Sequence, residues 1–129
     1  MTKVVIDTNV LVSALLSPFG APGRVLDMAL TGGIIVCYDA RILAEYNDVL
    51  ARPKFGFNKR DVKSLVDFIY STGVSVIPTP LNVELPDEDD RVFLEVAKHC
   101  NAYLITGNMR HFPEDEKIVT AAQFLDSYL

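Results

Sequence analysis

Short apolar segments alternate with amphipathic segments along the chain, and this alternation constrains the fold most strongly. The short segments are rich in β-branched residues, as buried strands are, and span 3–6, 33–37, 73–77, 102–106 and 117–120. Apolar residues at helical spacing occur directly after Asp7 and in segments 22–31, 39–51, 59–72, 89–100 and about 120–128. Alternating buried strands and helices predict a parallel sheet that is covered on both faces. We therefore expect a three-layer α/β/α fold with a central parallel sheet of about five strands.

Length and composition set the class of protein. A chain of 129 residues fits one domain, residues 1–129, that can bury a core, and half of its residues are apolar, which argues against disorder. No apolar stretch approaches the roughly 18 residues of a membrane span, and the N-terminus has no secretion signal. Cys37 and Cys100 have no CxxC spacing, so they indicate neither a disulfide framework nor a zinc site. We expect a cytoplasmic protein with two reduced thiols and no membrane partner.

The charge distribution is uneven. A net charge of −5 argues mildly against unspecific binding of nucleic acid, but it leaves room for a polyanion that is bridged by cations. Five of the 12 basic residues lie in segment 52–63, namely Arg52, Lys54, Lys59, Arg60 and Lys63. Phe55 and Phe57 lie among them. This segment is either a solvated surface, with Phe57 packed into the core or a dimer interface, or a binding surface for a nucleic-acid backbone on which a phenylalanine stacks.

Polar residues follow two of the predicted strands. Asp7 comes directly after segment 3–6, and Thr106 and Asn108 bracket Gly107 at the end of segment 102–106. In a parallel sheet, ligand-binding groups collect at the carboxyl ends of the strands, near a topological switch point. The simpler interpretation is that Asp7 caps the next helix and that Thr106, Gly107 and Asn108 form an ordinary turn.

Two further acids belong to predicted helices. Asp90 lies in the first turn of helix 89–100 on the side that faces the core, and Glu45 borders the apolar stripe of helix 39–51. The structural alternatives are an interaction of the acids with the helix dipole and an i,i+4 pair between Arg41 and Glu45. Asp89 precedes Asp90 and could share its role. The two histidines, His99 and His111, we interpret as solvated or packed side chains.

The order and spacing of these motifs resemble the PIN domain, in the branch grouped with toxins of toxin–antitoxin pairs. The resemblance runs from "VVIDTNVLVSALL" through "LAEYNDVLARPKF" and "DEDDRVFLEVAKHCNAYLITGNMRHF" to the final helix. It implies that Asp7, Glu45 and Asp90 occupy the family's three acidic metal-binding positions. It also implies that Asn108 occupies a fourth metal position, often aspartate, and that Thr106 supports the site. Asn108 keeps a hard oxygen ligand but removes a charge, so a second metal should bind less tightly.

The resemblance implies a metal-dependent endoribonuclease that cleaves phosphodiesters of single-stranded RNA, with the residues just named as its catalytic set. Carboxylates that converge from different elements suit Mg²⁺ or Mn²⁺, and such chemistry requires no protein nucleophile. A set of basic residues would hold the RNA: Arg52, Lys54, Lys59 and Arg60. The resemblance further implies a homodimer and, if the chain is the toxin of such a pair, an antitoxin protein as partner.

Three other interpretations differ in what they require. A catalytically silent PIN-like module that binds RNA or a protein stays open because of Asn108, and metal-dependent cleavage distinguishes it from the enzyme. A phosphatase of the haloacid dehalogenase type normally needs a second aspartate two positions after the first, where this chain has Asn9. A phospho-acceptor receiver domain needs paired acids before the end of the first strand and an acceptor aspartate after segment 73–77, and the sequence has neither.

Overall fold

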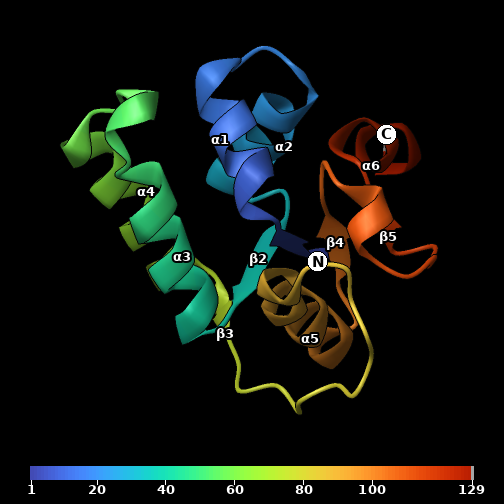
Figure 1. Cartoon of the computed structure of the whole chain (residues 1–129). Coiled ribbons are helices and arrows are strands. Elements are labelled where there is room, and N and C mark those ends of the chain that lie inside the picture. The colour runs from blue at the N-terminus through green and yellow to red at the C-terminus, as the bar shows by residue number, and fades with distance from the viewer. Residues whose placement is uncertain (129) are drawn as a thin grey trace.

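A parallel sheet forms the centre of the computed structural model, which describes residues 1–128 (Figure 1). Leu129, the last residue of the predicted domain, lies outside the described residues. The strands are β1 (Lys3–Ile6), β2 (Ile35–Tyr38), β3 (Val74–Ser75), β4 (Tyr103–Ile105) and β5 (Ile118–Val119). The α-helices are α1 (Thr8–Leu16), α2 (Ala21–Leu30), α3 (Ala40–Leu50), α4 (Lys59–Thr72), α5 (Arg91–Cys100) and α6 (Ala121–Tyr128), and the 3₁₀-helices are η1 (Pro53–Phe55), η2 (Glu88–Asp90) and η3 (Met109–His111). None of the helices within residues 1–128 has the length and apolar character that a membrane crossing requires.

The strand order places β1 at the centre of the sheet. The order is β3-β2-β1-β4-β5, and every neighbouring pair is parallel. Val4 of β1 pairs with Val36 of β2 on one side and with Tyr103 of β4 on the other. Helix α5 packs against β1, β2 and β4, whereas α4 packs against β2, and α2 packs against both α1 and α6, so that helices surround the sheet (Figure 1). The predicted three-layer α/β fold with a central parallel sheet of about five strands is confirmed.

Burial of β1 on both faces places the residue that follows it. Val4, Val5 and Ile6 are at most 1% exposed, which explains why this strand shows no polar alternation. Large, fully buried side chains from the helices complete the core: Leu11, Ile42, Tyr46, Leu50, Phe93, Leu94 and Phe124. Because the apolar residues of β1 are anchored in this core, Asp7 is fixed at the carboxyl edge of the sheet.

Four predicted strands differ from the observed ones at their ends. Strand β4 begins one residue later and ends one residue earlier than segment 102–106 predicts. The edge strands β3 and β5 have two residues each, shorter than segments 73–77 and 117–120, because each pairs with a neighbour on one side only. Strand β2 begins at Ile35, later than segment 33–37 predicts. Gly32 adopts a φ of +84°, and the N–H of Gly33 donates to the carbonyl of Met28, so the end of α2 extends into the predicted strand.

Candidate functional site

Asp7 and Thr106 meet at the switch point of the sheet, where β1 and β4 lie side by side. The backbone N–H of Asp7 donates to the carbonyl of Ile105 over 2.9 Å, and the Thr106 hydroxyl donates to Oδ2 of Asp7 over 2.8 Å. Both side chains are buried, with Asp7 5% exposed. The Asp7 side chain makes no capping hydrogen bond to α1, so the alternative role of a helix cap is wrong. Asp7 is instead a buried carboxylate that a residue of the neighbouring strand holds in place.

Glu45 approaches this carboxylate from α3. The next residue, Tyr46, is fully buried, and its hydroxyl donates to the carbonyl of Ile6, which ties α3 to the end of β1. The hydroxyl of Thr8, in the first turn of α1, donates to Oε2 of Glu45. The i,i+4 pair with Glu45 does not form, because the guanidinium of Arg41 pairs with two other acids, Asp39 and Glu95.

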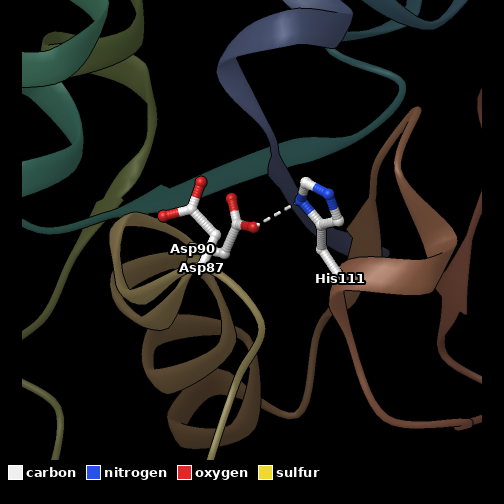
Figure 2. A group of neighbouring side chains, drawn as sticks. All are labelled: Asp87, Asp90 and His111. Carbon is white, nitrogen blue, oxygen red and sulfur yellow. Dashed lines mark hydrogen bonds and ion pairs between the residues drawn. The ribbon is translucent and has the colours of Figure 1, made fainter.

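Asp90 approaches from the start of α5. Its side chain makes no capping hydrogen bond, and Asp87 caps η2 instead by accepting from the N–H of Asp89 over 3.0 Å. The Asp90 side chain is only 14% exposed, and its Oδ2 lies 2.8 Å from Nδ1 of His111 (Figure 2). Asp89, the other candidate in this acidic run, is exposed. The structure therefore supports Asp90, rather than Asp89, as the acid that faces inward.

The three carboxylates lie close enough to affect each other's protonation. Burial raises the pKa of Asp7 from 3.8 to about 6, against the hydrogen bond from Thr106, and the charges of Asp90 and Glu45 add to the increase. Burial also raises the pKa of Glu45, with Thr8 opposing the shift and the charges of Asp89 and Asp90 adding to it. The pKa of Asp90 is raised by burial as well, against the hydrogen bond with His111. We call Asp7, Glu45 and Asp90 the acidic group; their role as metal ligands stays a prediction.

Asn108 lies beside the acidic group but on the surface. Its backbone N–H donates to the Thr106 hydroxyl over 3.0 Å, and the same hydroxyl donates to Asp7. Thr106 therefore connects the Asp7 carboxylate to the first residue before η3. The side chain of Asn108 is exposed, and its place as a fourth metal ligand stays a prediction.

The basic segment lies at the end of α3 and the start of α4. The positive charge of Arg52 is near enough to Glu45 to act against the rise in that residue's pKa. The Nζ atom of Lys54 lies 5.1 Å from the centre of the Phe55 ring. Lys59 and Arg60 open α4 and are exposed. The segment presents positive charge to solvent, and its binding of RNA stays a prediction.

Comparison with known proteins decides the family. A family model described as PIN domain matches residues 3–110. The chain belongs to the PIN domain family. An uncharacterized protein of Methanocaldococcus jannaschii is 41% identical to it over 113 residues, which cover 82% of this chain and 70% of that protein. The fold of this PIN domain is also similar to the crystal structure of VapBC2 from Rickettsia felis bound to a DNA fragment from their promoter, with a TM-score of 0.56 and 16% identity over 84% of this chain and 90% of that chain.

Two residues that the sequence did not predict for the site, Thr8 and His111, lie beside the acidic group of the PIN domain. Thr8 is not among the predicted site residues, yet its hydroxyl donates to Glu45. His111 was interpreted as packed or solvated, whereas the structure places its ring against Asp90 (Figure 2). The position of His111, three residues after Asn108 in the segment that follows β4, is the sequence feature that could have placed it near the acidic group.

The raised pKa of Asp7 predicts how stability depends on pH when chelator keeps the protein free of metal. A carboxyl whose pKa rises on folding stabilises the protein below its ordinary pKa of 3.8, and this contribution is lost as the pH rises through about 6. Asp7→Asn removes the ionisation and keeps an oxygen that accepts from Thr106. The variant should therefore resist urea better than the parent at pH 8, by up to about 3 kcal/mol, and the difference should nearly vanish at pH 4.

Glu84→Gln is the matched control, because it removes an exposed carboxylate from the segment before η2. Urea unfolding of the three proteins in chelator at both pH values measures the effect. Equal stability of the parent and Asp7→Asn at pH 8 would contradict the assignment of Asp7 as a buried carboxylate with a raised pKa.

Proposed function

We propose that this PIN domain is a divalent-metal-dependent endoribonuclease that cleaves single-stranded RNA. PIN domains are in general nucleases, and hence hydrolases. The observation that carries the proposal is the acidic group, in which Asp7, Glu45 and Asp90 gather from β1, α3 and the start of α5. The proposed catalytic set adds Thr106 and Asn108, and Mg²⁺ or Mn²⁺ is the proposed cofactor.

The lack of lysine and arginine partners distinguishes the acidic group from two other acids of the core, Asp39 and Glu95. Asp39 and Glu95 are as deeply buried as Asp7, but Arg41 forms an ion pair with each of them. Within residues 1–128, no lysine or arginine forms an ion pair with a member of the acidic group. Buried charge without a partner is costly, and residues with raised pKa values in a shared site are functional candidates. This arrangement supports a site whose missing positive charge comes from a bound cation.

The donor atoms of the acidic group fit a hard divalent ion. All are carboxylate oxygens, the ligands that Mg²⁺ and Mn²⁺ prefer. In each carboxylate one oxygen contacts a neighbouring side chain, which is Thr106, Thr8 or His111. The second oxygen of each carboxylate is then able to bind a cation, while the first fixes its orientation. Bound metal would polarise a phosphate, lower the pKa of a water and stabilise the leaving oxygen.

Residues beside the acidic group support RNA as the substrate. Arg52 lies near Glu45, and Lys54, Lys59 and Arg60 continue the positive surface. The rings of Phe55 and Phe57 stack on each other with centroids 5.6 Å apart and planes 13° apart. The outer face of either ring would offer a stacking surface to a base of a single strand. We propose that phosphates bind the basic residues while the scissile phosphate reaches the acidic group.

We also propose a cellular role. The PIN branch that the sequence resembles and the likeness to VapBC2 support a toxin of a toxin–antitoxin pair, with an antitoxin as partner. In this proposal, residues 1–129 form one domain that acts in the cytoplasm as a homodimer.

A second candidate is a catalytically silent module that binds RNA or a protein. The observation that favours it is Asn108, a neutral and exposed residue at the proposed fourth metal position. Such a module would keep metal binding or RNA binding without cleavage, so an activity assay separates the two candidates.

Cleavage of an unstructured RNA oligonucleotide is the first test. The purified protein should cleave it weakly in Mg²⁺ or Mn²⁺ and not at all in excess chelator, because carboxylates alone cannot activate the attacking water. A fully paired RNA of the same sequence is the control substrate and should be cut more slowly. Binding of the single strand without cleavage in either metal would favour the silent module, and unchanged cleavage in chelator would contradict the proposed chemistry.

Asp90→Asn tests the acidic group directly. Loss of an indirect partner of a metal ligand costs roughly 10–100-fold, so loss of a ligand should reduce cleavage by about 100-fold or more. Because the substitution relieves repulsion, the variant in chelator should be as stable as the parent or more stable. Added Mg²⁺ should raise the melting temperature of the parent more than that of the variant.

Asp89→Asn is the matched control for this experiment, since Asp89 is the exposed neighbour of Asp90. Thermal melts with and without Mg²⁺ and cleavage rates of all three proteins complete the test. A lower melting temperature of Asp90→Asn in chelator, together with an intact Mg²⁺ response and intact cleavage, would make Asp90 a structural residue.

A further inference from the structure

A second group of potential ligands adjoins the acidic group and shares one member with it. One ligand atom each from Asp87, Asp90 and His111 lies within 4.8 Å of the others. The aspartates lie at the two ends of η2, directly before α5, and the imidazole reaches them from η3 (Figure 2). Segments more than 20 residues apart therefore meet here, and Asp90 belongs to both groups.

The donor set of this second group differs from that of the acidic group. It contains an imidazole nitrogen in addition to two carboxylates. Imidazole suits Zn²⁺ and similar transition metals, whereas Mg²⁺ prefers oxygen ligands throughout. Tetrahedral Zn²⁺ with bonds near 2.1 Å places its ligand atoms roughly 3.4 Å apart. Nδ1 of His111 and Oδ2 of Asp90 are already closer than that, at 2.8 Å, so an ion would enter by replacing their hydrogen bond.

The backbone around these side chains is held in place. The N–H of Asp90 donates to the carbonyl of Asp87 over 3.2 Å, and the N–H of His111 donates to the carbonyl of Asn108 over 3.0 Å. Phe112, directly after His111, is buried and anchors the end of η3. Asp87 is exposed, and the N–H of Asp89 holds its side chain at η2. His111 is 38% exposed, so an ion can enter from solvent.

We infer that Asp87, Asp90 and His111 form an inhibitory site for Zn²⁺ or a similar transition-metal cation. An ion at this site holds the carboxylate of Asp90, which then no longer contributes its full charge to the acidic group. Zn²⁺ bound here therefore competes with Mg²⁺ for Asp90. The inhibition rests on the proposed nuclease function, whereas the binding of Zn²⁺ does not.

Calorimetric titration of Zn²⁺ into metal-free protein tests the site without RNA. His111→Gln should weaken Zn²⁺ binding at least tenfold, because glutamine keeps a hydrogen bond to Asp90 but supplies no imidazole nitrogen. The control is His99→Gln, which removes the other histidine of the chain, an exposed residue of α5, and should leave the affinity unchanged. Circular dichroism verifies that both variants are folded. Equal Zn²⁺ affinity of His111→Gln and the parent, or an equal loss in His99→Gln, would overturn the inference.

Two further measurements separate this site from the acidic group. Addition of Mg²⁺ should still raise the melting temperature of His111→Gln, because the glutamine amide keeps a contact that orients Asp90 and all three proposed carboxylate ligands are retained. Zn²⁺ added at constant Mg²⁺ should inhibit RNA cleavage by the parent and should inhibit His111→Gln only at concentrations at least tenfold higher. Equal inhibition of both proteins would contradict the shared role of Asp90. A parent that never cleaves RNA would refute the nuclease proposal, and calorimetry alone would then decide the Zn²⁺ site.

Discussion

A carboxylate buried at the end of the central strand is the constraint around which the rest of the site is arranged. The side chain of Asp7 cannot turn out into solvent, because the three residues before it are buried in the core and its backbone N–H still bonds to Ile105 of β4. Its charge is stabilised by one neutral hydroxyl, that of Thr106, and is opposed by two other acids. A fold that keeps such a residue loses stability in the metal-free state as the pH rises through about 6, and a bound cation would offset this loss.

The surrounding elements are tied to this point through hydroxyl groups. Tyr46 connects α3 to the end of β1, and Thr8 connects the first turn of α1 to Glu45. Thr106 connects Asp7 to the segment that leads into η3. These neutral donors orient the carboxylates without neutralising their charge. Arg41, one turn before Glu45 in α3, instead forms ion pairs with Asp39 and Glu95. The fold therefore pairs two of its acids with an arginine and leaves the acidic group without a lysine or arginine partner, and this difference supports a functional role for the acidic group.

The sequence predicts those features that depend on local patterns. Residues 4–6 are continuously apolar, and β1 forms within the predicted limits. Helix α4 begins and ends as its apolar spacing predicts. Asp7 and Thr106 could be expected to meet, because the carboxyl ends of parallel strands share one edge. The contacts of Glu45 with Thr8 and of Asp90 with His111 could not be predicted in this way. They join residues 37 and 21 positions apart, and they depend on how the helices pack. Local patterns could not predict the lengths of β3 and β5 either, because the number of neighbours in the sheet determines how far an edge strand continues.

The central claim is that Asp7, Glu45 and Asp90 together hold a catalytic metal ion. Anomalous X-ray scattering from crystals soaked in Mn²⁺ tests it most directly, because manganese gives an anomalous signal that the light atoms of the protein do not give. The account predicts a strong anomalous peak between these three carboxylates, which disappears in crystals of Asp90→Asn soaked in the same way. Manganese that binds elsewhere on the molecule while the space between the three carboxylates holds none would contradict the account.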